Sequence, residues 1–388
     1  MSDVRFLTRE IGSLGKPSWR VKEFAGRPLE ERDFEEAERW GKRLDVGGHE
    51  ELVEGLRAGD LGREEVDDWA ALYAIRLLEK VGLDVVYDGE QRRTEMYDHV
   101  AAFASGFEPR GTVRSFDNKY YAKAAVVEPP SVDGAQDVEE FEFVRAHTDR
   151  VVKVPLTGAY TMEDWSYDEH YAHEGALGGS AERRYDARRR FVSDVATNVI
   201  LPNVRGLVER GAEWIQIDEP AATTKPDEVP LVVEGFNQAT RGVEAKKSMH
   251  ICFSDYGALW PAVLELDDCL ELQLEFANRD SREPGTHEED RPGYAETLRL
   301  FKEHGYPNVG LGVLDIHSDF VEPAELVRDR ILYAVDVLGD PGRIQVNPDC
   351  GLRTRSWDVV YEKLANMVQG TRLAEHQLNR AHAAPAGA

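Results

Sequence analysis

The sequence predicts an α/β fold, and more specifically a (β/α)8 TIM-type barrel. Short apolar runs alternate with longer amphipathic stretches along the chain, which is typical of parallel βαβ units. Eight such runs are present, the number of strands in a closed barrel. Polar or ionisable side chains follow nearly every run, and the carboxyl ends of barrel strands are where such enzymes place their active sites.

The expected strands are residues 9–14, 84–87, 151–156, 213–217, 248–253, 270–275, 309–314 and 343–346. Each is short, apolar and bounded by turn-forming or charged residues, as buried strands are. Helical periodicity separates most of them, over residues 66–81, 183–210, 258–266, 294–304, 323–338 and 357–375.

Two regions exceed a minimal barrel. Residues 15–63 are charged and helical in pattern, whereas residues 100–150 hold a hairpin-like alternation followed by an acidic helical run. We expect both to be insertions in the first two βα loops. The long polar stretch 278–293 is a candidate mobile active-site loop. We expect residues 1–388 to form one catalytic domain, with 382–388 as a disordered tail.

The composition is strongly acidic. The chain has 73 Asp and Glu against 47 Lys and Arg, a formal net charge of −26, and only 12 of the basic residues are Lys. An acidic, lysine-poor surface is typical of proteins from a high-salt cytoplasm, where ions screen self-repulsion. Nucleic acids and anionic membranes require basic patches, so neither is an expected partner.

The cysteines and the N-terminus indicate a reducing compartment. Three cysteines are too few for a disulfide framework. The sequence has no run of about 18 apolar residues, and its first residues lack the apolar core of a signal peptide. We therefore expect a cytoplasmic protein.

The pair His250 and Cys252 is the first sign of chemistry. On a strand, side chains two residues apart point to the same face, so both would lie together at the end of the strand. A thiolate beside an imidazole suits zinc. Core packing is the alternative, because free cysteine is among the most buried residue types.

Other strand ends extend this site. In a closed barrel, Glu275 and Cys350 would meet His250 and Cys252 at one rim and complete a zinc site. Two thiolates and a carboxylate make zinc a weak acid for splitting water, but suit it to holding a substrate thiolate. A closed structural zinc site is the alternative. Cys269, in the turn before residues 270–275, is expected to be a packing residue.

Taken together, the chain resembles the catalytic half of cobalamin-independent methionine synthase, in a short single-domain form. The matching motifs are Ile11-Gly12-Ser13, Gly89-Glu90, Thr161-Met162-x-x-Trp165-Ser166, Ile217-Asp218-Glu219-Pro220-Ala221, His250-x-Cys252, Glu275, Asp315-Ile316-His317-Ser318 and Val346-Asn347-Pro348-Asp349-Cys350-Gly351-Leu352. They run from residue 11 to about residue 355, and the last motif is the most specific. The resemblance implies a (β/α)8 barrel and a methyltransferase that uses zinc to make methionine.

The resemblance also implies a role for each matching residue. The zinc ligands would be His250, Cys252, Glu275 and Cys350. Glu90 and Asp218 would hold the amino group of homocysteine, and Ser13 with the backbone of Ile11 would bind its carboxylate. His317 would handle a proton, with Asp315 beside it. Trp165 would pack against the pterin of the methyl donor.

The methyl donor stays open between methyltetrahydrofolate and a methylated corrinoid, such as methylcobalamin or a corrinoid protein. The longer form of the family has an Arg-Ser pair before a Pro-Pro pair, whereas residues 124–130 here read AAVVEPP. One alternative function is alkyl transfer to another small thiol, such as a coenzyme-M-like sulfonate, which Glu90 and Asp218 would repel. Another is a zinc-binding barrel subunit without turnover.

Overall fold

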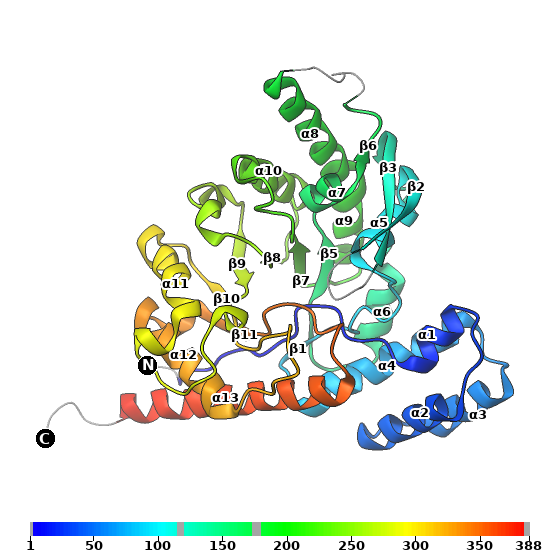
Figure 1. Cartoon of the computed structure of the whole chain (residues 1–388), viewed down its shortest axis with the longest axis horizontal. Coiled ribbons are helices and arrows are strands. Elements are labelled where there is room, and N and C mark those ends of the chain that lie inside the picture. The colour runs from blue at the N-terminus through cyan, green and yellow to red at the C-terminus, as the bar shows by residue number, and fades with distance from the viewer. Residues whose placement is uncertain (1–2, 115–119, 173–179, 384–388) are drawn as a thin grey trace, which may run out of the picture.

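A computed structural model describes residues 3–114, 120–172 and 180–383 of the chain. Parallel strands form its centre and helices surround them (Figure 1). The six-stranded sheet has the order β11-β10-β9-β8-β7-β5, and every neighbouring pair is parallel. Its strands are β5 (Val154–Thr157), β7 (Trp214–Asp218), β8 (Lys246–Ile251), β9 (Cys269–Leu274), β10 (Val309–Gly312) and β11 (Ile344–Asn347).

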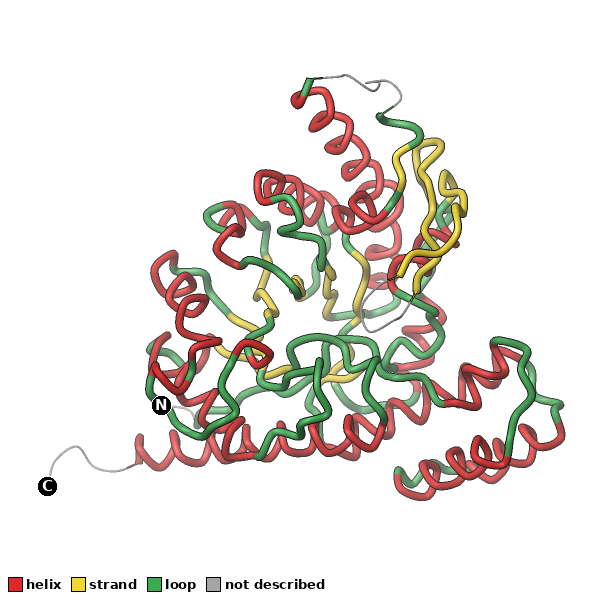
Figure 2. The backbone as a smooth tube through the Cα atoms, in the orientation of Figure 1, coloured by secondary structure: helices red, strands yellow, loops and turns green. Residues whose placement is uncertain are grey.

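The first expected strand forms only isolated contacts. Thr8 pairs with Val346 and Arg9 pairs with Val85, both in parallel, and Figure 2 shows this segment as loop. A second, two-stranded sheet joins β1 (Val85–Val86) to β4 (Val151–Val152). The predicted α/β fold with parallel sheets is therefore confirmed. Because regular pairing is divided between separate sheets, the closed eight-stranded barrel is not.

Most expected helices are present. They are α4 (Arg63–Val81), α8 (Ala181–Val195), α9 (Leu201–Glu209), α11 (Pro292–His304), α12 (Ala324–Leu338) and α13 (Trp357–Ala383), with a π-helical turn at Ala196–Ile200 between α8 and α9. The predicted helix 258–266 is wrong, because this region forms two 3-10 turns, Tyr256–Leu259 and Ala262–Glu265. Pro261 lies between the turns and has no N–H to donate to a continuous helix.

Three α-helices were not predicted. They are α5 (Met96–Phe103), α7 (Ala159–Trp165) and α10 (Val229–Ala239), and the last two each follow a strand of the six-stranded sheet. In α10 seven of the eleven residues are buried, so its apolar positions do not form the one-sided stripe that marks an amphipathic helix.

Both expected insertions contain regular structure. The first holds α1 (Ser18–Phe24), α2 (Glu31–Arg43) and α3 (His49–Ala58). The second contains α5 (Met96–Phe103), the antiparallel pair β2 (Ser105–Arg114) and β3 (Tyr120–Ser131), and α6 (Val138–Ala146); β6 (Tyr167–Asp168) extends the pair. The hairpin-like pattern is thus confirmed. The single-domain assignment stays a prediction, and most of the predicted tail, 384–388, lies outside the described residues.

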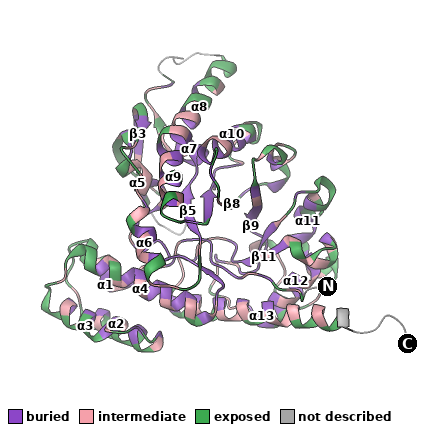
Figure 3. Ribbon diagram, turned by 180° about the vertical axis from the view of Figure 1, so that it is seen from behind, coloured by how far each residue is buried: buried purple, intermediate pink, exposed green. Residues whose placement is uncertain are grey.

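The interior of the strand region carries charge, although Figure 3 shows it as buried. The Arg9 guanidinium lies 2.6 Å from the Glu271 carboxylate, and both side chains are fully buried. Arg9 also packs over the Trp214 ring, at 5.1 Å from its centroid. A buried ion must be paired to be tolerated, so these contacts fix the first segment against the sheet.

The stretch 278–293, predicted to be mobile, is anchored at both ends. Near its start, Asp280 pairs with Arg291 at 2.5 Å and with Arg330 at 3.0 Å, and all three side chains are buried. The backbone N–H groups of residues 276–278 donate to the Asp349 carboxylate at 2.6–2.9 Å. Whether the middle of the stretch moves stays a prediction. None of the described helices is long and apolar enough to span a membrane.

The buried ion pair gives a test of the fold. Arg9→Met would leave the Glu271 carboxylate uncompensated, and we expect the free energy of unfolding to fall by about 3–5 kcal/mol in urea denaturation. The double variant Arg9→Met/Glu271→Leu should recover most of this loss. Arg39→Met, which breaks an exposed pair with Asp358, is the control and should change little. An equal effect at both sites would contradict a stabilising role for the buried pair.

Candidate functional site

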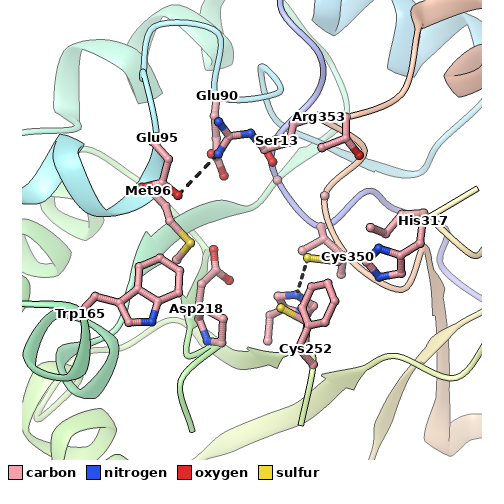
Figure 4. A pocket seen from close by; sticks show the side chains of 18 residues that line it. Ser13, Glu90, Glu95, Met96, Trp165, Asp218, Cys252, His317, Cys350 and Arg353 are labelled. Carbon is pink, nitrogen blue, oxygen red and sulfur yellow. Dashed lines mark hydrogen bonds and ion pairs between the residues drawn. The ribbon is translucent and has the colours of Figure 1, made fainter. Parts of the chain in front are cut away.

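One cavity lies where the strand ends meet the loops that follow them (Figure 4). Its volume is about 130 Å³. A water molecule needs roughly 10–15 Å³ of such space, so a ligand of on the order of ten non-hydrogen atoms fits. The lining residues are Ile11, Gly12, Ser13, Glu90, Glu95, Met96, Trp165, Asp218, Pro220, His250, Cys252, Phe253, Ile316, His317, Cys350, Gly351, Arg353 and Thr354.

Three of the four predicted zinc ligands meet at one side of this cavity. The ligand atoms of His250, Cys252 and Cys350 all lie within 4.8 Å of one another. The His250 Nε2 atom is 3.4 Å from the Cys350 sulfur, and its Nδ1 atom is 3.1 Å from the carbonyl oxygen of Gln273. This second contact fixes the ring so that Nε2 points at the thiols, as it does in histidines that bind metals.

The two thiols differ in acidity. The hydrogen bond from Cys252 lowers the pKa of Cys350 to about 5, and the neighbouring His250 lowers it further against the opposing effect of burial. The same hydrogen bond, together with burial, raises the pKa of Cys252 well above its usual value. The pair therefore holds one thiolate, which is the form that binds metals and attacks electrophiles.

Glu275 lies outside this group. One of its carboxylate oxygens accepts from the Phe253 N–H at 2.9 Å and from the Asn278 side chain at 3.2 Å. The other, Oε1, is buried without a hydrogen-bond partner among the described residues and lies 3.6 Å from His317 Nε2. Phe253 has a φ of 53°, a conformation that bulky residues rarely adopt and that is concentrated at functional sites.

Glu90 and Asp218 lie across the cavity from the thiols. Glu90 follows β1 in a tight turn, with φ of 66° at Gly89 and 54° at Glu90. A Cβ on Gly12 would stand 2.4 Å from a Glu90 carboxylate oxygen, so a larger residue there would displace the Glu90 side chain. Burial, with a contribution from the nearby Glu90 carboxylate, raises the pKa of Asp218 to about 7, although His250 opposes the shift.

The Gln216 side chain contacts two predicted substrate-binding residues, Ile11 and Asp218. Its side-chain N–H group donates to the carbonyl oxygen of Ile11 at 2.8 Å and to Asp218 Oδ1 at 2.7 Å. Its own oxygen accepts from the buried ammonium of Lys153. This contact couples the segment that carries Ile11 and Ser13 to the end of β7.

The remaining predicted residues occupy different places. Trp165, at the end of α7, lines the cavity and stacks on Tyr121 with ring centroids 5.4 Å apart. Asp315 is not among the lining residues. Its carboxylate accepts from the backbone N–H of His317 at 2.8 Å and from the Ser318 hydroxyl at 2.9 Å. It therefore supports the loop of His317 and does not contact the imidazole. Cys269 is buried and its thiol donates to the Glu271 carbonyl, as expected of a packing residue.

Sequence reasoning missed several lining residues. Glu95 and Arg353 lie in loops and Met96 is the first residue of α5, positions at which no periodicity indicates which side chains face inward. Lys153, between β4 and β5, and Gln216, on β7, support the site, and polar residues inside apolar runs are the signal that could have revealed them. Buried polar side chains at such positions require partners, and so indicate a network.

The fold and the site define a class: an α/β protein that gathers two thiols, two imidazoles and three carboxylates around a small cavity at the ends of parallel strands. The chain belongs to the cobalamin-independent methionine synthase family of methyltransferases, because the model for the family "Cobalamin-independent synthase, Catalytic domain" matches residues 56–373.

Similar proteins of known name agree with this assignment. A methionine synthase of Thermoplasma volcanium is 36% identical over 369 residues, which cover 93% of this chain and 96% of the relative. A methionine synthase of Pyrococcus abyssi is 34% identical, over 96% of this chain and 94% of the relative. A solved B12-independent methionine synthase from Shewanella sp. W3-18-1, in complex with selenomethionine, matches with a TM-score of 0.70 at 22% identity, over 96% of this chain and 99% of the other. At that identity the structural likeness supports the fold alone.

The contact made by Gln216 gives a test of the site's architecture. Gln216→Leu would remove an acceptor from the Lys153 ammonium and a donor from Asp218, and we expect a loss of about 1–3 kcal/mol in the free energy of unfolding. Urea denaturation measures it. Gln238→Leu, which removes a partly buried amide contact on α10, is the matched control. A smaller effect at Gln216 than at Gln238 would contradict its role as a buried link.

Proposed function

We propose that this chain is a zinc-dependent methyltransferase that transfers a methyl group to the sulfur of homocysteine and forms methionine. One observation carries the proposal. A single cavity of amino-acid size is lined by sulfur and nitrogen donors and by three carboxylates, and Figure 4 shows Glu90 and Asp218 on the other side from Cys252 and Cys350. Homocysteine presents a thiol at one end and an ammonium at the other, so its groups match the two sides of the cavity.

The side chains present fit a zinc ion. His250, Cys252 and Cys350 offer one nitrogen and two sulfurs within 4.8 Å of one another, which is the ligand chemistry that zinc prefers. Glu275 offers a buried oxygen without a hydrogen-bond partner among the described residues. We therefore keep all four as the proposed ligands. Bound there, zinc would lower the pKa of the homocysteine thiol and leave its sulfur nucleophilic.

The chain's own residues orient the substrate. The ammonium would lie between Glu90 and Asp218, and charge-assisted hydrogen bonds to carboxylates are among the stronger polar contacts. The carboxylate would lie at Ser13 and the backbone of Ile11, which Gln216 and Lys153 hold in place. Fixing both groups would place the sulfur at the proposed zinc position, and such positioning contributes to catalysis.

His317 is the proposed proton-handling residue. It lines the cavity and its Nε2 atom lies 3.6 Å from Glu275 Oε1. A pterin leaving group would take a proton when it releases its methyl group, and His317 could donate it. A corrinoid leaving group would not need one. Asp315 contributes by holding the backbone of His317.

The donor is proposed to be methyltetrahydrofolate or a methylcorrinoid, free or held on a corrinoid protein. Trp165 forms an aromatic wall of the cavity, and either a pterin or a corrin ring could pack against it. The alternative that the chain acts on a sulfonate thiol is disfavoured by the carboxylates of Glu90 and Asp218, which would repel the sulfonate. The complete set of site residues disfavours a subunit without turnover.

We also propose that the strands close into the predicted barrel. The pairs Thr8–Val346 and Arg9–Val85 connect β11 to β1, and β4 leads directly into β5. These contacts support a complete ring in which residues 8–9 take the place of the first strand.

Zinc dependence is tested by removing one ligand. Loss of an outer-shell partner weakens metal binding by roughly 10–100-fold. Cys350→Ser removes a proposed direct ligand, so we expect its affinity for zinc to fall by at least roughly 10–100-fold. Metal content after purification and competition with a chelator measure this. Cys269→Ser is the matched control, because Cys269 is a buried cysteine outside the group. Undiminished zinc in Cys350→Ser would contradict the site, and unfolding of the variant would indicate a structural metal.

The reaction is tested by turnover of the zinc-loaded protein with homocysteine. Methylcobalamin and methyltetrahydrofolate, with short and long glutamate tails, are offered separately, in low and in high salt. We expect methionine from at least one donor, and mass spectrometry detects it. His317→Gln should slow the reaction with the folate and leave that with methylcobalamin nearly unchanged. Absence of methionine with every donor would contradict the proposed function.

A further inference from the structure

The cavity is rich in acid and holds one strong cation. Glu90, Glu95 and Asp218 line it, and Arg353 is the only Arg or Lys among the described lining residues. The proposed substrate is a zwitterion, and two of the acids suffice for its ammonium. Its carboxylate would be repelled by the same acids unless a cation balanced them, and a neutral Ser13 hydroxyl cannot do so.

The backbone places Arg353 beside Ser13. Leu14 and Leu352 form an isolated parallel bridge, which brings their chain neighbours Ser13 and Arg353 together. Both Ser13 and Arg353 line the cavity. A Cβ on Gly351 would stand 2.4 Å from the Ser13 hydroxyl oxygen. Figure 4 shows the Arg353 side chain next to Ser13, reaching over the cavity.

The present partner of Arg353 holds it loosely. Its guanidinium lies 3.5 Å from the Glu95 Oε1 atom, and the other Glu95 oxygen is engaged by the backbone N–H of Tyr97 at 2.8 Å. A guanidinium has five N–H donors and binds a carboxylate best through two parallel hydrogen bonds. The Arg353 side chain is 29% exposed, so a ligand in the cavity can reach it.

We infer that Arg353 binds the α-carboxylate of the amino-acid substrate, and that Glu95 holds the guanidinium over the cavity until the substrate replaces it. The inference rests on the proposed function for the identity of the substrate. It adds a charged residue to the site and makes Arg353 a determinant of specificity for thiols that carry an α-carboxylate.

The test compares two thiols that differ only in the carboxylate. These are homocysteine and 3-mercaptopropylamine, which lacks that group. Arg353→Gln should raise the KM for homocysteine roughly 10- to 150-fold, the value of a hydrogen bond to a charged group, and leave the KM for the amine nearly unchanged. Arg353→Lys should restore part of the loss, because an ammonium keeps the charge without the two-point geometry. The KM for the methyl donor should not move.

Arg355→Gln is the matched control. Arg355 lies two residues further on and pairs with Asp319, outside the lining of the cavity. An equal rise in the KM of both thiols for Arg353→Gln would overturn the inference. So would a rise confined to the methyl donor, which would place Arg353 in the donor site instead.

Calorimetry separates this inference from the proposed function, because it requires no turnover. Homocysteine that binds wild-type protein but binds Arg353→Gln at least tenfold more weakly supports the inference, even if no methionine forms. Equal affinity of the two proteins for homocysteine overturns it, even if the wild type makes methionine.

Discussion

The buried ammonium of Lys153 is the constraint on which the site depends. The side chain is fully buried and donates to the carbonyl oxygens of Glu10 and Ile11, at 2.9 and 2.8 Å, and to the side chain of Gln216. Burying a cation costs free energy unless its N–H groups are hydrogen-bonded. The carbonyl oxygens of Glu10 and Ile11 are therefore held close to the Lys153 ammonium. Residues 8–14 make only isolated bridges to their neighbours. The contact with Lys153 therefore holds this segment in place, as regular hydrogen-bonded pairing holds the other strands.

Similar buried polar contacts hold the other residues of the site in position. The Gln216 side chain, which is bound to Lys153, donates a hydrogen bond to Asp218 and so limits its movement. The Gln273 carbonyl orients the His250 ring. Asp349 accepts from the backbone that follows Glu275 and fixes it in place. Each support lies on or directly after a strand, and none of the three lines the cavity. The positions of the functional side chains thus depend on buried polar contacts at the strand ends, where the packing of the sheet limits movement.

The sequence was a good guide where the pattern is local. Seven apolar runs became strands close to their expected bounds, because short apolar runs between turns have few other ways to bury their surface. It failed where tertiary contacts decide. Residues 9–14 depend on Lys153, and α10 is buried on too many sides to look amphipathic. The direction of Glu275 toward Phe253 and His317, and the inward position of Arg353, result from loop geometry that no periodicity encodes.

The charge of the cavity connects these features to selectivity. Three carboxylates in a chain of net charge −26 favour an ammonium and repel any anionic group that lacks its own cation. A homocysteine thiolate carries two such groups, the sulfur and the α-carboxylate. The proposed zinc position would serve the first and Arg353 the second, and the two lie on different sides of the cavity. A thiol without an amino group would face the carboxylates uncompensated, and one without a carboxylate would leave Arg353 paired to Glu95. Under the proposed function, the site would recognise the amino acid through three charged groups, namely the zinc ion for the sulfur, Arg353 for the α-carboxylate and the cavity carboxylates for the ammonium.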